Sequence, residues 1–353
     1  MKVLHFHFGK DGGAERFFVH LINGLARAGV EQKIVIRPDR KWKAEIHPSI
    51  EVIESHYRSA SLDRFLLPIR MKRLIRSWKP DSVLGWMPRG AKLMPDEKQP
   101  LRLVRLGDYP VSLDKFRNID VVVCNTPGIA RHVQEMGWSR GVEVISNFTD
   151  PERVAPVSRA TLDTPPGAFV VSSMGRFVPR KGFDVILRAM ARLPGVYFWL
   201  LGGGEQEENL RALATELGVT DRVRFAGWQA DPRAYIAASD CFIMSSSHEP
   251  LGNVILEAWA QRVPVVSTRA EGPSWFMRDG EDGLMVDVGD AAGMADAVAH
   301  LQRDGELRDR LVKGGSETLE KKFSESAVVQ AYIDLFGSRR RRHGSDSGTP
   351  DAS

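Results

Sequence analysis

Short apolar runs alternate with amphipathic helical stretches along almost the whole chain, and this alternation constrains the fold more than any other feature. After a first run at 3–8, apolar runs follow at 33–36, 50–53, 82–87, 102–106, 120–124 and 142–145, and again at 169–174, 196–201, 223–228, 241–244, 263–268 and 283–286. Strands that alternate with helices build parallel sheets covered by helices. The sequence therefore predicts an α/β protein with two doubly wound parallel sheets.

The length of the chain and one irregular stretch predict two domains. A chain of 353 residues is long enough for two hydrophobic cores. Residues 147–166 contain four prolines and show no periodicity, which is typical of a linker. We therefore predict a first domain at 1–150, a linker at 151–166 and a second domain at 167–323. Residues 337–353, which include four consecutive arginines, are predicted to be a disordered basic tail.

Composition and cysteine usage favour a cytoplasmic protein. No apolar run is long enough to span a bilayer, and the first run is too short and too interrupted by histidine for a signal peptide. Cys124 and Cys241 each lie in an apolar run without metal-ligand spacing, so we expect both to be buried, reduced and inert. The net charge is +4, but no nucleic-acid-binding motif accompanies it, so no nucleic acid is expected as a partner. An anionic membrane surface or a phosphorylated acceptor would account for the charge equally well.

The stretch 245–261 has the features of a ligand-binding turn. The apolar run 241–244 leads into small and polar residues, a turn follows at 249–253, and a helix extends from Val254. Unpaired amides at such a helix start face a ligand beyond the strand end. Glu257 lies early in the helix, so its side chain tilts back toward the turn that holds Glu249. Two carboxylates beside backbone donors suit a nucleotide sugar, but a helix cap and a solvated surface residue would explain these acids equally well.

The spacing Glu-x7-Glu, after a strand and at a helix start, resembles the signature of the retaining glycosyltransferase family 4, which has the GT-B fold. That fold has two Rossmann-like domains with the active site in the cleft between them. The resemblance implies that Glu249 contacts the donor sugar and that Glu257 holds the ribose hydroxyls. The turn residues that it implies for the donor phosphate are Leu251, Gly252, Asn253 and Val254.

A second motif follows the predicted strand 169–174. Gly175 and Gly182 bound a loop that carries Arg176 and Lys181. Arg binds phosphates bidentately and Lys adds a point charge, although charged loops are usually only solvated. The loop matches the family's Gly-Arg-x4-Lys-Gly pattern, which implies that Arg176 and Lys181 bind the donor diphosphate and stabilise the leaving group. Because no Asp-x-Asp stands at a strand end, we predict no metal and no cofactor, with a UDP-sugar or GDP-sugar expected as the donor substrate.

Two glycine-containing turns and the last helix also fit the resemblance. Gly12 and Gly13 resemble the Gly-Gly-x-Glu turn that many members place between donor phosphate and acceptor, with a plain strand-to-helix turn as the alternative. Gly227 and Trp228 end the predicted strand 223–228, where relatives bind the nucleotide base. Residues 324–336 resemble the helix that crosses back onto the first domain, so the resemblance covers residues 1–336.

The chain departs from the family pattern at two places. Many members have a His at a strand tip in the acceptor pocket, but residues 84–89 contain none, and Asp108 is our candidate for a polar group in that place. Residues 271–275 replace the commoner Gly-x-Pro-Glu, which leaves the donor-sugar contacts there open. His5 and His7 share a strand face, and we expect both to be packed and hydrogen-bonded rather than catalytic.

A predicted helix at 62–78 is amphipathic and basic. Residues 62–79 include six basic side chains and a single acid, Asp63. Such a helix can lie on an anionic membrane, and the alternative is a core helix with a solvated basic face. We therefore predict a cytoplasmic protein for which peripheral contact with the inner face of the cytoplasmic membrane is one of two alternatives.

The residues and the resemblance together predict a retaining, metal-independent glycosyltransferase. It would transfer a sugar from a nucleotide diphosphate sugar to a hydroxyl of a glycan or glycolipid, in the synthesis of lipopolysaccharide or another cell-envelope glycan. Two alternatives stay open, namely a nucleotide-sugar epimerase on the same fold and a non-catalytic protein that binds membranes or anions. The epimerase would convert the nucleotide sugar without an acceptor.

Overall fold

The computed structural model describes residues 1–10, 12–57, 61–97 and 99–344, with side chains up to Ser338. The chain divides into two compact units, one formed by Met1–Phe148 with Glu325–Ser353 and the other by Thr149–Ser324. The predicted first domain ends close to this division, whereas the predicted linker belongs to the second unit. Arg159 ties that segment to the second unit, because its guanidinium donates to the Asp240 carboxylate at 2.9 Å.

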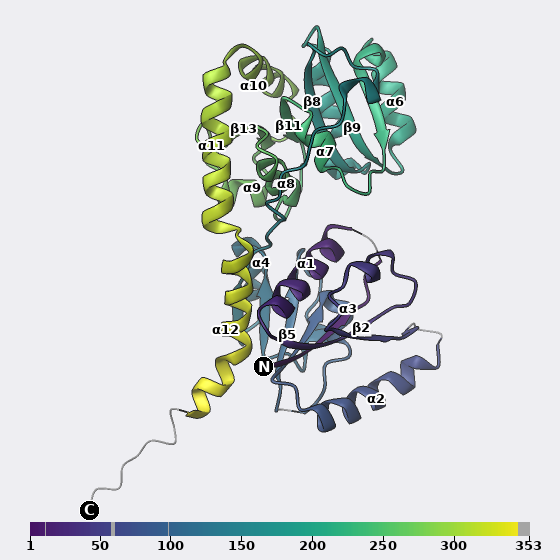
Figure 1. The fold of residues 1–353 in the computed structure, drawn as a ribbon, viewed down its shortest axis with the longest axis vertical. Helices are drawn as coiled ribbons and strands as arrows, with labels where there is room; N and C mark the ends of the chain where they lie inside the picture. Colours follow the sequence, from purple (N-terminus) through teal and green to yellow (C-terminus); the bar gives the residue numbers. More distant parts are fainter. Residues whose placement is uncertain (11, 58–60, 98, 345–353) are drawn as a thin grey trace, which may run out of the picture. The chain divides into compact units, whose positions relative to one another are not determined.

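The first domain is a seven-stranded parallel sheet in the order β3-β2-β1-β4-β5-β6-β7 (Figure 1). Its strands are β1 (Lys2–His7), β2 (Glu31–Ile36), β3 (Glu51–Glu54), β4 (Ser82–Trp86), β5 (Leu101–Leu106), β6 (Val121–Cys124) and β7 (Gly141–Val144). Its helices are α1 (Gly13–Arg27), α2 (Asp63–Trp78), α3 (Met87–Ala91), α4 (Pro127–Glu135) and α12 (Glu325–Gly344), with 3-10 turns η1 (Lys41–Glu45) and η2 (Asp114–Phe116). Successive residues of β1 point to opposite faces, so Val3 packs with α1 and α12 while Leu4 packs with α2, α3 and α4.

The C-terminal helix α12 packs on α1. A Cβ on Gly24 would lie 2.8 Å from Val329 Cγ2, so the two helices approach at a position that only glycine fills without a shift. Arg27 pairs with Glu325 across the same contact. The helix continues to Gly344, so the prediction of a disordered tail is wrong for 337–344, and 345–353 lie outside the described residues. Residues 338–343 contain neither glycine nor proline, and arginine is a good helix former, so the sequence there does not end the helix.

The second domain is a six-stranded parallel sheet in the order β10-β9-β8-β11-β12-β13 (Figure 1). Its strands are β8 (Phe169–Arg176), β9 (Val196–Gly203), β10 (Val223–Gly227), β11 (Cys241–Met244), β12 (Val265–Thr268) and β13 (Leu284–Val286). Its helices are α5 (Phe183–Met190), α6 (Glu207–Glu216), α7 (Arg233–Ala237), α8 (Asn253–Ala260), α9 (Glu271–Phe276), α10 (Ala291–Arg303) and α11 (Gly305–Lys322), with 3-10 turns η3 (Arg159–Leu162), η4 (Pro179–Lys181) and η5 (Thr220–Arg222). Two doubly wound parallel sheets confirm the predicted fold class.

The two cysteines are buried in the cores of the two domains. Cys124 and Cys241 are free thiols with no exposed surface. Burial raises the pKa of Cys124 to about 12 and also raises that of Cys241, so both are inert as predicted. No helix in the described part of the chain is long and apolar enough to cross a membrane.

The strand order of each sheet changes direction at one point. This switch point lies between β1 and β4 in the first domain and between β8 and β11 in the second. Ligands of open parallel sheets bind outside the carboxyl ends of the strands at such points. The segments that follow β1, β4, β8 and β11 are therefore where a site is expected, and three of them carry motifs that the sequence singled out.

Candidate active site

The loop after β8 lies against the end of β11. Gly182 has φ +64°, and a Cβ on it would lie 2.3 Å from the carbonyl oxygen of Ser245, so this approach requires glycine. The hydroxyl of Ser245 donates to the carbonyl of Lys181 at 2.8 Å. The amide of Ser247 donates to the carbonyl of Arg180 at 2.9 Å. These bonds hold Lys181 at the switch point of the second sheet.

Lys181 and Glu249 form an ion pair at this point. Lys181 Nζ donates to Glu249 Oε2 at 2.5 Å, across 68 positions of sequence. The hydroxyl of Ser246 donates to the same carboxylate oxygen at 3.3 Å. The side chains of Lys181 and Glu249 are only 16% and 13% exposed, so the pair is largely shielded from water. The structure thus brings together one predicted residue from each of the two main motifs.

The turn after Glu249 leads directly into α8. Leu251 is buried and anchors the turn, and Gly252 has φ +97° immediately before the helix. In the described structure no side chain caps this helix start, which is the arrangement that suits an anionic group. Asn253 and Val254 form the first turn of α8, and Glu257 is half-buried one turn further along.

Glu271 also holds the Glu249 turn. Its carboxylate accepts from the Glu249 amide at 3.2 Å and lies 2.8 Å from His248 Nδ1. Burial acts to raise the pKa of Glu271, but hydrogen bonds from its own amide, His248 and the Glu249 amide outweigh it and lower the pKa. Glu271 lies in the segment that departs from the family pattern, and here it positions the backbone of a predicted donor residue.

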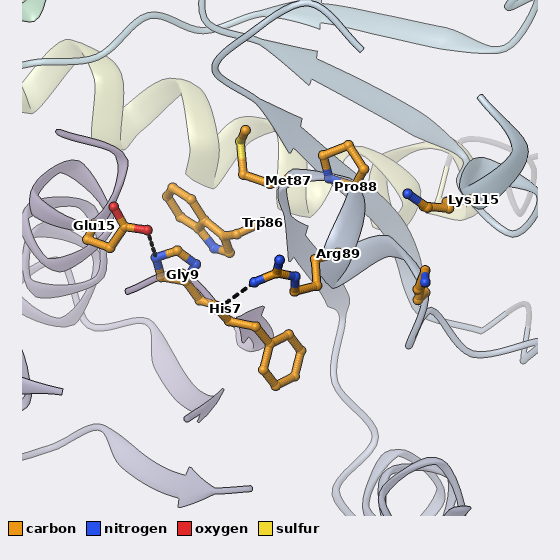
Figure 2. Close-up of a pocket in the computed structure, with 10 residues that line it drawn as sticks. His7, Gly9, Glu15, Trp86, Met87, Pro88, Arg89 and Lys115 are labelled. Atoms are coloured by element: carbon orange, nitrogen blue, oxygen red, sulfur yellow. Dashed lines mark hydrogen bonds and ion pairs between the residues drawn. The ribbon is translucent and has the colours of Figure 1, made fainter. Parts of the chain in front are cut away.

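A cavity of about 510 Å³ lies at the switch point of the first domain (Figure 2). The end of β1, the start of α1 and the segment after β4 form its wall. Its lining residues include His7, Gly9, Glu15, Trp86, Met87, Arg89, Lys92 and Lys115. The cavity therefore combines a carboxylate and an imidazole with three cations.

His7 and Glu15 lie next to one another in this cavity (Figure 2). Glu15 Oε1 is 3.7 Å from His7 Nε2, and a Cβ on Gly9 would lie 1.7 Å from the same oxygen, so the carboxylate occupies space that only glycine leaves open. Burial, helped by the charge of Arg105, lowers the pKa of His7 to about 3. A neutral imidazole and a carboxylate are groups that bind sugar hydroxyls.

The expectation for the two histidines is partly confirmed. Both are buried, and the His7 ring packs 4.4 Å from that of Phe18 between centroids. His5 Nδ1 lies 3.4 Å from Trp86 Nε1, which donates to it. Neither ring nitrogen of His7 has a hydrogen-bond partner within the described residues. The prediction that His7 is hydrogen-bonded is therefore wrong.

Met87, at the carboxyl end of β4, has φ +58°. This left-handed conformation costs a non-glycine residue roughly 1–2 kcal/mol, and such residues cluster at ligand sites. The segment after Met87 packs closely on β1, because a Cβ on Gly90 would lie 2.7 Å from the carbonyl oxygen of Phe6. The strained turn directs Arg89 toward the cavity (Figure 2).

Two lipopolysaccharide core biosynthesis glycosyltransferases of Rhizobium meliloti strain 1021 are similar to this sequence. It is 60% identical to LpsE over 339 residues, which cover 96% of this chain and 100% of LpsE. It is 49% identical to LpsD over 336 residues, which cover 95% of this chain and 98% of LpsD. The family model for glycosyl transferases group 1 matches residues 155–318. This chain belongs to the glycosyl transferases group 1 family.

A solved structure shows the same fold as this glycosyltransferase. HepE of Anabaena, in complex with UDP-glucose, matches it with a TM-score of 0.82 over 96% of this chain and 100% of HepE. The sequences are 22% identical, so the likeness concerns the fold, and it confirms the predicted GT-B architecture.

Asp108 lies outside the cavity of the first domain. It follows β5, and its Oδ1 accepts from the amide of Tyr109 at 2.9 Å. It is not among the described residues that line the cavity. Gly12 directly precedes α1, which starts at Gly13, and a Cβ on Gly12 would lie 3.1 Å from Oε2 of the cavity residue Glu15. The acceptor role of Asp108 stays a prediction, and the cavity itself presents His7 and Glu15 instead.

The remaining predicted donor residues of the glycosyltransferase lie at or just after the ends of strands in the second sheet. Arg176 ends β8 and is exposed, and within the described part of the chain its guanidinium has no hydrogen-bond or ion-pair partner. Gly227 ends β10, which β9 separates from β8. Trp228 follows and is 71% exposed. The base-binding role of Gly227 and Trp228 stays a prediction.

Sequence reasoning did not single out four residues that the structure places at these sites. They are Glu271 in the second domain and Arg89, Lys92 and Lys115 in the first. Charged residues soon after a strand end were the available signal for Arg89 and Lys92. Lys115 gave no such signal, because it lies beyond β5 on η2 and reaches the cavity only through the fold.

Proposed function

We propose that this glycosyltransferase transfers a sugar from a nucleotide diphosphate sugar to a hydroxyl of a lipopolysaccharide core or related glycolipid acceptor, with retention at the anomeric carbon. The ion pair of Lys181 and Glu249 at the switch point of the second sheet carries this proposal. The names of LpsE and LpsD support the acceptor class, and the UDP-glucose complex of HepE supports the donor class.

The candidate residues around this ion pair and at the start of α8 then each have a defined role in donor binding or catalysis. Arg176 and Lys181 stabilise the charge that develops on the diphosphate when its bond to the anomeric carbon breaks. The amides at the start of α8 bind the same phosphates. Glu249 accepts hydrogen bonds from donor-sugar hydroxyls, and its ion pair keeps Lys181 oriented before the donor binds. Glu257 accepts from the ribose hydroxyls.

The proposal is tested by incubating the purified chain with UDP-sugars and GDP-sugars and with core acceptor from a truncated strain. We expect transfer with one donor, and proton NMR of the product should show the anomeric configuration of that donor. Thermal shift with UDP, GDP and ADP identifies the base, since a ligand at 100 times its Kd stabilises by about 2.7 kcal/mol. Conversion of the nucleotide sugar without an acceptor would show an epimerase instead.

Metal independence is part of the proposal. Two cations and helix amides already serve the diphosphate, so transfer should persist at its full rate in excess EDTA. The assay is repeated after dialysis against the chelator, with and without added Mg²⁺ or Mn²⁺. Loss of activity on chelation that is restored by either ion would show that the donor needs a metal.

We further propose that the enzyme works at the inner face of the cytoplasmic membrane and contacts it through α2. The helix buries Leu67, Met71 and Ile75, yet four more large apolar side chains, on the helix and on the residue before it, are exposed. These are Leu62 (79% exposed), Phe65 (70%), Leu66 (52%) and Ile69 (52%). A core helix with a solvated basic face does not account for them, whereas apolar residues beside basic ones suit an anionic bilayer surface.

Removing four of the five basic side chains of α2 should abolish binding to anionic vesicles. Each Lys or Arg near such a surface adds up to about 1 kcal/mol, and salt screens it within roughly 8–10 Å. The variant replaces Arg70, Lys72, Arg73 and Arg76 by Gln, and vesicle sedimentation is measured at low and high salt. A chain that ends before Ser338 is the control for the C-terminal arginines. Unchanged binding of the α2 variant, or loss of binding in the shortened chain alone, would contradict a role for α2.

A further inference from the structure

A second cavity, of about 660 Å³, adjoins the one at the first switch point. The two share Arg89, Lys92 and Lys115, so they form one continuous depression of the first domain. We call the second cavity the basic groove, after its six cationic lining residues, Arg37, Arg64, Arg89, Lys92, Lys115 and Arg117. We propose that the basic groove binds phosphate or carboxylate groups of an acidic saccharide acceptor, which rests on the transferase activity proposed above.

Charge in the basic groove is unbalanced. Asp114 is the only acid among its described lining residues, against six cations, although the whole chain carries a net charge of only +4. Like charges gathered in one depression repel each other, and an anionic ligand removes this cost. Within the described structure, Lys92, Lys115 and Arg117 are exposed and their side chains have no ion-pair partner. Their charges are therefore available to a ligand.

Two of the arginines donate to backbone carbonyls. Arg89 Nη1 donates to the carbonyl of Phe8 at 3.4 Å, and Arg37 Nη2 donates to the carbonyl of Tyr57 at 3.2 Å. A carbonyl orients a guanidinium without cancelling its charge. Arginine so oriented is suited to bidentate recognition of phosphate and carboxylate. The groove thus combines two arginines that donate to backbone carbonyls with three exposed cations, in a volume typical of small-molecule sites.

The neighbouring cavity explains why an acceptor saccharide fits better than an isolated anion. Glu15 and His7 present acceptors and donors for sugar hydroxyls at one end of the depression. The shared residues Arg89, Lys92 and Lys115 connect this end to the groove. A saccharide whose reacting hydroxyl lies near Glu15 therefore places its charged substituents among the cations. The donor diphosphate already has its own cations on the second domain.

The first test measures acceptor kinetics of a groove variant of the full chain and of a control variant that loses the same number of charges. A third variant exchanges the two cations of the groove. Lys115→Gln/Arg117→Gln should raise the KM for acceptor about tenfold or more, with kcat and the KM for donor unchanged, because two charge-assisted contacts are lost. Lys115→Arg/Arg117→Lys should restore the wild-type KM. The control Lys41→Gln/Arg131→Gln removes two exposed charges elsewhere on the domain and should leave all constants unchanged. An unchanged acceptor KM in the groove variant would overturn the proposal.

Acceptor chemistry identifies the bound group. If phosphate is recognised, dephosphorylated acceptor should show the raised KM with the wild type and no further rise with the variant. Carboxyl-reduced acceptor gives the same result if carboxylate is recognised. Equal KM for intact, dephosphorylated and carboxyl-reduced acceptors would overturn the proposal. So would loss of binding to phosphatidylglycerol vesicles in the variant without a change in acceptor KM, because the groove would then serve lipid headgroups.

A binding measurement separates the groove from the transferase proposal. Inorganic phosphate is titrated into the wild type and the two Gln variants in the presence of saturating UDP, which blocks the donor site. We expect a salt-sensitive phosphate site that weakens about tenfold in the groove variant alone. A wild type that binds phosphate in this way but transfers no sugar would refute the proposed function and leave the anion site standing. Equal phosphate binding by all three proteins would refute the anion site.

Discussion

Replacing Lys181 or Arg176 by Ala should lower kcat by roughly 10²–10³-fold, the range typical for loss of one group that stabilises developing charge. The two variants reach this result differently. Arg176 is exposed and its side chain makes no hydrogen bond or ion pair in the described structure, so its removal costs the fold little and acts on the leaving group alone. Lys181 also neutralises Glu249, so its removal leaves a largely buried carboxylate without its cation.

The matched control for these variants is Arg188→Ala. Arg188 is an exposed cation of α5 in the same domain, without a side-chain partner in the described structure, and its removal should leave kcat unchanged. Single-turnover kinetics separate the chemical step from product release. Circular dichroism and the thermal midpoint check that the Lys181 variant is folded. Full activity of both Arg176→Ala and Lys181→Ala would mean that the diphosphate binds elsewhere.

The motifs of the second domain could be predicted from the sequence because each one is a short, continuous segment. Gly182 and Gly252 each stand where the backbone has positive φ between a strand and a helix, and such positions recur at fixed spacing in sequence. Parallel sheets then bring the carboxyl ends of neighbouring strands to one edge. That geometry places Lys181 against Glu249 although neither residue alone indicates the other.

The first domain gave fewer signals because its cavities are assembled from distant segments. The lining includes Arg37 after β2, Arg89 after β4 and Lys115 on η2. Each is an ordinary surface cation when considered by itself, and only the fold gathers them. Asp108 also shows that a sequence pattern does not predict where a side chain points. The pattern located the end of β5, but the Asp108 carboxylate accepts a hydrogen bond from the Tyr109 amide.

Lowering the pH from 6.5 should destabilise the first domain through His5 and His7. Burial lowers the pKa of each to about 3, from an ordinary value of 6.5. Between these values the unfolded chain binds protons that the folded chain does not, so stability is full above pH 6.5 and is lost as the pH falls toward 3. At about 1.36 kcal/mol per pH unit for each histidine, the two together remove about 4 kcal/mol by pH 5.

Proton uptake on unfolding measures this effect without assuming a two-state transition. Calorimetry at pH 5 in buffers of different ionisation enthalpy should show about two more protons taken up by the wild type than by His5→Asn/His7→Phe. Asn at position 5 keeps an acceptor for the Trp86 indole, and Phe at position 7 suits a ring that makes no hydrogen bond in the described structure. His56→Asn replaces an exposed histidine of the same domain and should give the wild-type value. If the double variant takes up as many protons as the wild type, the histidines are charged in the folded protein. In that case the cavity beside Glu15 holds an imidazolium, and hydroxyl binding there has to be reconsidered.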